Sequence, residues 1–208
     1  MKETVIILSK THMKGCSCIG GLTLGGRYVR LLDQNGFNQP EDTDLEPGQT
    51  WEIEFRPNPH ATPPHVEDVF VLKRIQKGQL GAGMTILDFI GERDIPIWRG
   101  HPDELFDRLI QWTSSGSGYI DKKGGIPDHS VGFWLSDRNL VRRDYKGVRY
   151  QYPSTQGYRN IKFKGFQEPV EEIPAGTLLR VSLARWYAFE DGEPEKCWLQ
   201  LSGWYDLD

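Results

Sequence analysis

Residues 16–32, Cys-Ser-Cys-Ile-Gly-Gly-Leu-Thr-Leu-Gly-Gly-Arg-Tyr-Val-Arg-Leu-Leu, contain two runs of strand-forming residues on either side of Gly25-Gly26. Glycine pairs favour the tight turns of β-hairpins, because glycine adopts the positive φ angles that those turns require. The segment therefore predicts a hairpin whose strands cover 16–24 and 27–32.

Strand patterns continue on both sides of this hairpin. Thr4–Leu8 is apolar and β-branched, while Trp51–Phe55 alternates apolar and acidic residues, as a half-buried strand does. Val66–Ile75 is a further candidate. Six more candidates follow, over 130–135, 140–145, 147–152, 158–163, 178–186 and 196–204. Short strands at this spacing, without long helices between them, predict small β-barrels or sandwiches.

The middle of the chain departs from this pattern. Pro102–Trp112 has a proline and two acidic residues in its first turn and one broad apolar face, which predicts a helix. Met84–Ile90 is apolar and fits either a helix or a strand. We expect a mainly β protein with a first module over 1–80, a connecting segment over 81–125 with a helix near 101–115, and a second module over 126–208.

Composition narrows the class of protein. The 208 residues are 38% hydrophobic and 26% charged, which is typical of a globular protein that needs no disulfides. The three cysteines are an odd number and indicate a reducing compartment. No basic leader and no apolar run of roughly 20 residues is present, so we expect a cytoplasmic protein without a membrane partner.

Three sets of residues together resemble the bacterial dual OB domain family. They are Val5–Thr11 followed by Cys18-Ile-Gly-Gly21, then Gly26-Arg-Tyr-Val-Arg30, and finally the C-terminal pair Arg180–Trp186 and Cys197–Trp204. The resemblance spans nearly the whole chain. It implies two OB-like β-barrels, and OB barrels commonly bind single strands through a basic groove and stacking aromatic rings.

Charge is concentrated in one stretch. Residues 138–166 hold eight basic residues and one acidic residue, a local charge of +7 in a chain whose total is −4. Tyrosines are interleaved with these cations, and cations with stacking rings are the two parts of a single-strand groove. The nucleic-acid-binding candidates are Arg142, Arg143, Lys146, Arg149, Arg159 and Lys162 for phosphates, and Tyr145, Tyr150 and Tyr158 for stacking. The competing interpretation is that the cations coat a solvated face and the rings fill the core.

A second basic group is a candidate ligand site. It consists of Lys10, His12, Arg27 and Arg30, beside the polar segment Ser9–Gly15, which we expect to be a loop able to cradle a phosphate. The segment lacks the spacing of a nucleotide-hydrolysing P-loop. Cys16 and Cys18 lack the partners of a zinc site, so we expect no metal and no cofactor.

We therefore expect a non-enzymatic protein that binds single-stranded DNA or RNA, in a bacterial mobile-element or defence context. No nucleophile with a base and an orienting acid stands out, although His129 follows Asp128 in a loop. Two alternatives stay open. One is a sensor or enzyme for a nucleotide or small phosphorylated ligand, bound in a cleft between the modules. The other is a protein-interaction module that meets its partner through acidic loops.

Overall fold

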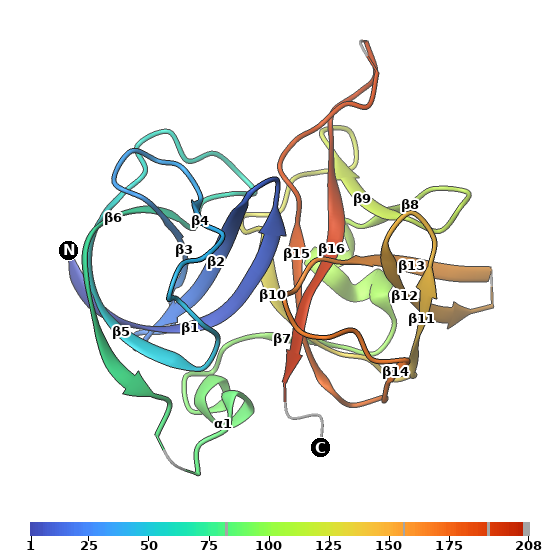
Figure 1. The fold of residues 1–208 in the computed structure, drawn as a ribbon. Coiled ribbons are helices and arrows are strands. Elements are labelled where there is room, and N and C mark those ends of the chain that lie inside the picture. Colours follow the sequence, from blue (N-terminus) through green and yellow to red (C-terminus); the bar gives the residue numbers. More distant parts are fainter. Residues whose placement is uncertain (82, 156, 191, 206–208) are drawn as a thin grey trace. The chain divides into compact units, whose positions relative to one another are not determined.

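The structure is a computed structural model that describes residues 1–81, 83–155, 157–190 and 192–205. Those residues form two compact units, coloured from blue to red along the chain in Figure 1. The first unit contains Met1–Thr62 and Val66–Ile95, and the second contains Pro63–His65 and the chain from Pro96 onward. Both units are built mainly of β-strands, as expected.

The first unit is a closed five-stranded β-barrel. Its strands are β1 (Lys2–Met13), β2 (Cys16–Thr23), β3 (Tyr28–Leu32), β5 (Gln49–Pro57) and β6 (Asp68–Gln79). They pair in the order β1-β5-β6-β3-β2, and β2 pairs back to β1, which closes the barrel. The short β4 (Gln39–Pro40) extends the sheet from β2. Only β3 and β6 are parallel among these pairs.

The expected hairpin is confirmed, because β2 and β3 pair across a turn that contains Gly25 and Gly26. The expected loop over Ser9–Gly15 is wrong. β1 runs through Ser9 to Met13, each residue of this part faces a residue of β2, and only Lys14 and Gly15 form the turn. The polar composition of this part misled the prediction, because closing the barrel gives these residues backbone partners in β2.

The second unit repeats the same strand connections in a longer sheet. Its main strands are β10 (Val131–Leu135), β11 (Leu140–Asp144), β12 (Val148–Ser154), β13 (Gly157–Phe163), β15 (Leu178–Leu183) and β16 (Lys196–Tyr205). They pair in the order β11-β12-β13-β16-β15-β10. Shorter strands flank them: β7 (Ile97–Arg99), β8 (Gln111–Trp112), β9 (Gly118–Asp121) and β14 (Glu172–Ile173).

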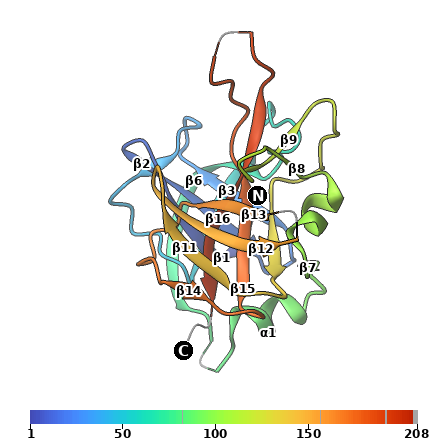
Figure 2. The ribbon, with the colours of Figure 1, turned by 90° about the vertical axis from the view of Figure 1, so that its right-hand side faces the viewer.

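The strands of the second unit correspond to those of the first unit in how they pair. In the first unit β1 pairs with both β5 and β2; in the second, β10 pairs with β15 and β11 pairs with β12. β13 and β16 are parallel, as β3 and β6 are. β10 and β11 are therefore two halves of one interrupted strand, separated by the turn-forming residues 136–139, and the second unit has the OB arrangement. Figure 2 shows β11, β12 and β13 side by side.

Helices are few and short. α1 (Ile86–Gly91) begins at Thr85, whose side chain accepts a hydrogen bond from the backbone N–H of Asp88 while the Asp88 carboxylate accepts from Thr85. The helix expected over Pro102–Trp112 is only the 3-10 helix η1 (Pro102–Arg108), and Gln111 and Trp112 form β8. The backbone inside η1 leaves helical angles from Leu105, because Leu105 and Phe106 are fully buried in the core instead of lining one helix face.

Each unit has its own hydrophobic core. The first is lined by strand residues such as Ile7, Val29 and Ile53, all nearly inaccessible to solvent. The second is larger and aromatic, and it includes Tyr150 and Trp204. Cys197 lies in this core, where burial raises the pKa of its thiol to about 12.

Closure of the first barrel depends on Gly21, which lies opposite Ile7 in the β1–β2 pairing. A Cβ atom at this position would lie 2.5 Å from Val5 Cγ1 and 2.9 Å from the Ile6 carbonyl oxygen. We predict that Gly21→Ala lowers the free energy of unfolding by about 1–3 kcal/mol, as overpacked cores do, in denaturant titrations. Gly81→Ala is the matched control, because nothing lies within 4 Å of its added Cβ. Equal stability of the two variants would contradict this account of closure.

Candidate functional site

A groove of about 880 Å³ lies on the outer face of the second unit. Its residues come from β11, β12, β13 and β16, from the turn between β11 and β12, from the segment between β15 and β16, and from residues 113–118. Side chains alternate along these strands: Tyr150, Tyr152 and Ile161 face the core, while Arg149, Gln151 and Lys162 line the groove. The alternation of the strands therefore places polar side chains on the groove side.

The strand register aligns three cations across the groove. Arg143 of β11 faces Arg149 of β12, Arg149 faces Lys162 of β13, and Lys162 faces Gln200 of β16. Lys146 in the β11–β12 turn and Lys164 just beyond β13 line the same groove. We call Arg143, Arg149 and Lys162 the cation row. Like charges facing one another across strands are destabilising, so the fold does not arrange this row for its own stability.

Among the described residues, these groove cations have no carboxylate partner. Within the described parts of the chain, no carboxylate lies at ion-pair distance from Arg143, Lys146, Arg149, Lys162 or Lys164. Asp144 also lines the groove, but its carboxylate pairs with Arg142 at 3.1 Å. Partial burial and the neighbouring charge of Lys162 lower the pKa of Lys164. The groove is therefore a site of uncompensated positive charge.

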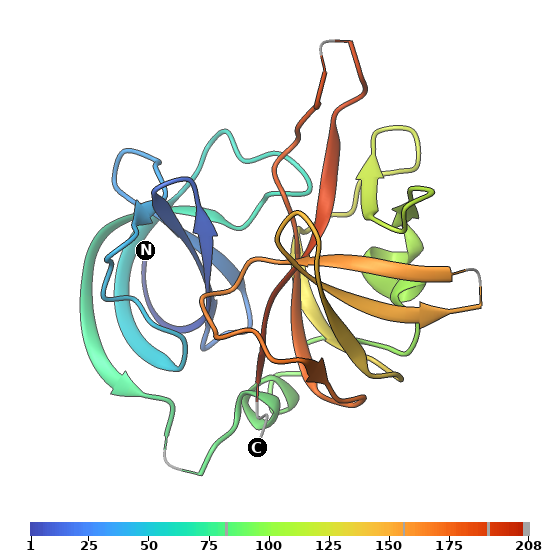
Figure 3. The same cartoon turned by 45° about the vertical axis from the view of Figure 1, so that its right-hand side comes forward.

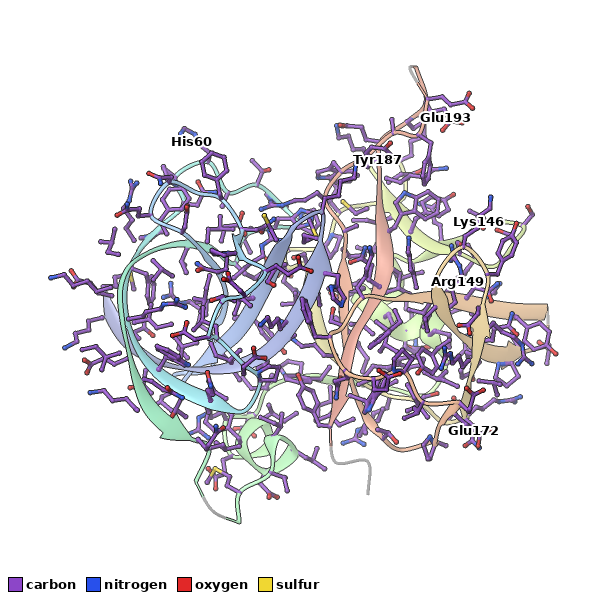
Figure 4. The ribbon with its side chains drawn as sticks, in the orientation of Figure 1. His60, Lys146, Arg149, Glu172, Tyr187 and Glu193 are labelled. Atoms are coloured by element: carbon purple, nitrogen blue, oxygen red, sulfur yellow. The ribbon has the colours of Figure 1, made fainter. Side chains whose placement is uncertain are left out.

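Exposed aromatic rings line the groove at two places. Tyr145 lies in the β11–β12 turn, beside Lys146, whose ammonium is 5.6 Å from the ring centroid. Tyr187 and Phe189 lie in the segment before β16 and are 55% and 66% exposed. Their ring centroids are 5.2 Å apart, and Phe189 lies 5.4 Å from Trp198 of β16. Figure 3 shows β16, in red, extending beyond the neighbouring strands, and Figure 4 labels Tyr187, Lys146 and Arg149.

Four residues predicted for this site lie elsewhere. Arg142 pairs with Asp144 and Glu171, and its guanidinium donates to the Pro169 carbonyl. Arg159 lies on the core side of β13, where it packs over the Trp112 ring and approaches Asp103 at 3.7 Å. Tyr150 is fully buried, and its hydroxyl donates to the Val170 carbonyl. Tyr158 is exposed at the end of β13 but does not line the groove.

The second predicted group, in the first unit, is neutralised by acidic partners. Lys10 pairs with Glu46 at 2.5 Å, Arg27 pairs with Glu3 at 2.8 Å, and the Arg30 guanidinium pairs with the Asp68 carboxylate. His12 lies 3.9 Å from Glu41. Each of these four side chains lies within 4.0 Å of a carboxylate, so the group does not form a shared site for an anion.

Several residues that line the groove are not among the residues predicted from the sequence. Lys164 lies inside the +7 stretch but is not among the predicted residues. Trp198 lies between the buried residues Cys197 and Leu199 of β16, so it faces the other side of the strand, is only partly buried and lines the groove. Tyr187 and Phe189 lie in a segment rich in acidic residues, and large aromatic residues in such a segment are the signal that could have identified them.

Three further features concern metal ligands, His129 and membrane-spanning helices. Among them, no group of three or more histidine, cysteine or acidic side chains could hold a metal ion. His129 hydrogen-bonds to Asp128, and its ring stacks on Trp98 with the ring centroids 5.7 Å apart. No helix in the described ranges is long and apolar enough to span a membrane.

The cation row predicts a measurable effect on stability. We expect Lys162→Gln, at the centre of the row, to raise the free energy of unfolding at low salt by about 0.2–1 kcal/mol, because it removes the repulsion by Arg149. Added salt should stabilise the parent protein more than this variant, since it screens the same repulsion. Denaturant titrations at two salt concentrations measure both effects. The control is Arg142→Gln, which breaks ion pairs and should lower the free energy of unfolding. If Lys162→Gln lowers it by a similar amount, Arg149 and Lys162 do not repel each other measurably.

Comparison with a protein-family model agrees with the fold. The sequence model described as "Dual OB-containing domain" matches residues 3–204. Two solved structures are similar at low identity. The p204 HINb domain has 11% identity and a TM-score of 0.34, over 97% of this chain and 96% of that chain. The tetrameric p202 HIN2 domain has 10% identity and a TM-score of 0.31, over 97% and 91%. No curated protein sequence matches. Because the family match covers nearly the whole chain, as the terminal motifs indicated, this protein belongs to the dual OB-containing domain family.

Proposed function

We propose that the second unit binds a single-stranded nucleic acid along its groove. The observation that carries this proposal is the convergence of five cations without carboxylate partners in the described residues, on one face, beside exposed aromatic rings. The position of the groove adds support. OB barrels bind oligonucleotides on the face of their second and third strands and on the loops between strands one and two and strands four and five. Here those parts are β12, β13 and the segments around Tyr145 and Tyr187.

The chemistry of the groove suits a single strand better than a duplex. Arg143, Arg149 and Lys162 would hold phosphates, and the release of counterions from those phosphates would drive binding. Tyr145, Tyr187 and Phe189 would stack on bases, which are accessible only when unpaired. The net charge of −4 does not oppose this, because residues 138–166 carry a charge of +7. The electrostatic potential that attracts a strand is the local potential of the groove, which its own cations set.

A small phosphorylated ligand such as a nucleotide is the second candidate. The groove volume of about 880 Å³ is within the range of sites that hold small ligands. Oligonucleotides of increasing length separate the two candidates. A strand-binding groove gains affinity from one nucleotide up to the site size, about 4–16 nucleotides for an OB barrel, whereas a nucleotide site gains nothing beyond the first residue.

Phosphate binding by the cation row predicts a change in salt dependence. Replacing Arg143, Arg149 and Lys162 together with glutamine should reduce the slope of log affinity against log salt by about 2, at about 0.7 for each phosphate that the protein no longer neutralises. Fluorescence anisotropy with a labelled 12-nucleotide strand at several salt concentrations measures the slope.

The matched control removes the same charge from the first unit, by replacing Lys2, Lys73 and Lys77 with glutamine. These side chains lie on β1 and β6, outside the groove, so the slope should not change. Equal slopes for both triple variants would show that only net charge matters. If the parent protein binds no strand at micromolar concentration and low salt, the proposed function is wrong.

Stacking predicts a different signature. Tyr187→Ala should weaken binding by about 1–3 kcal/mol, the value of one base–aromatic stack, while leaving the salt slope unchanged. Tyr158→Ala is the control, because Tyr158 is similarly exposed, at 57% against 55%, but does not line the groove. The same anisotropy titration measures both. If both variants lose the same affinity, Tyr187 does not stack on a base of the bound strand.

A further inference from the structure

A chain of hydrogen-bonded amides lies beside the cation row in the groove. Gln151 of β12 faces Asn160 of β13, and Gln151 Nε2 donates to Asn160 Oδ1 at 2.8 Å. Asn160 Nδ2 in turn donates to the backbone carbonyl of Ser115 at 2.6 Å. All three residues line the groove. Cations that bind phosphates and rings that stack on bases bind all base types similarly. Binding without sequence preference therefore does not require these amides.

The direction of this chain is fixed by its last member. A backbone carbonyl only accepts hydrogen bonds, so the NH₂ group of Asn160 must face Ser115 and its oxygen must face Gln151. The NH₂ group of Gln151 must then face Asn160. This leaves Gln151 Oε1 as an acceptor, and no residue described in the structure donates to it. A free glutamine amide can offer either its NH₂ group or its oxygen to a ligand. Because the NH₂ group of Gln151 is bound to Asn160, Gln151 offers its oxygen, which is an acceptor.

The anchor of the chain is held in place by a compact turn. The Thr113 N–H donates to the Ser117 carbonyl at 3.0 Å, and the Asn160 N–H donates to the Gly116 carbonyl at 2.7 Å. A Cβ at Gly116 would lie 2.1 Å from the Tyr158 carbonyl oxygen, so the turn packs closely against β13. The Ser115 carbonyl therefore stays at Asn160, and the orientation of Gln151 is set before a ligand arrives.

The register places this acceptor next to the phosphate-binding positions. Gln151 follows Arg149 by two residues on β12, and Asn160 precedes Lys162 by two residues on β13. Residues two apart on a strand share a face and lie about 7 Å from one another. A nucleotide whose phosphate contacts the cation row can therefore bring its base to Gln151.

We infer that Gln151 selects bases by accepting a hydrogen bond from an exocyclic amino group, so that the groove prefers cytosine and adenine to uracil and thymine. Cytosine and adenine carry such an amino group on the edge used in base pairing. Uracil and thymine carry a carbonyl oxygen at position 4, where cytosine has its amino group, so a pyrimidine held with position 4 at Gln151 Oε1 is accepted as cytosine and opposed as uracil or thymine. This inference rests on the proposed function, since it assumes that a strand occupies the groove.

The test compares three strands that differ only at this edge. Anisotropy titrations of the full chain at pH 7.5 use 12-nucleotide strands of deoxycytidine, deoxyuridine and N4,N4-dimethyldeoxycytidine, of which the last keeps the ring but has no amino hydrogen. One hydrogen bond predicts about a two- to tenfold preference for the deoxycytidine strand over both others. These comparisons need no variant, so they do not depend on a variant folding.

Replacing the acceptor should abolish the preference. We expect Gln151→Leu to bind the deoxycytidine and deoxyuridine strands equally, with the deoxyuridine affinity close to that of the parent. Gln76→Leu, a matched change at an exposed position of β6, should keep the preference. If the parent binds all three strands equally, or Gln151→Leu keeps the preference, the inference is overturned and strand binding stands. If no strand binds, the proposed function itself fails.

Discussion

The alternation of side chains along β12 and β13 is the constraint on which the rest of the second unit depends. Tyr150 and Ile161 face each other and enter the core, so Arg149 and Lys162, one residue away on each strand, must face outward. A slip of one residue would bury two cations and expose the aromatic core. Burial of the rings therefore fixes the register, and the register in turn aligns the cations and the Gln151–Asn160 amide pair.

The two predicted basic groups differ in whether their charges are balanced by nearby carboxylates. In the first unit, basic side chains such as Lys10, Arg27 and Arg30 have acidic partners, so their charges are balanced locally. In the second unit, the cation row is left without carboxylate partners in the described residues, at a cost in repulsion between facing strands. Because the cation row is expected to lower stability, it is better explained by binding of an anion than by a contribution to folding.

Much of the fold is accessible from the sequence. The candidate strands over 130–135, 140–145 and 158–163 correspond closely to β10, β11 and β13, since alternation and turn residues are local features. The helix expected over Pro102–Trp112 is shorter than its pattern indicates. Its apolar residues pack into the core of the second unit, and this tertiary packing overrides the helical preference of a short segment.

The sequence by itself determined that the chain is mainly β, resembles the dual OB family and carries its positive charge in residues 138–166. Only the tertiary structure decided which cations act together. Arg142 and Arg143 are neighbours in sequence, yet Arg142 is held by Asp144 and Glu171 while Arg143 joins the row. Likewise, Tyr187 lies far after Tyr145 in sequence but lines the same groove. Charge and ring content are properties of composition, whereas the face that a side chain occupies depends on pairings between distant strands, which local sequence does not encode.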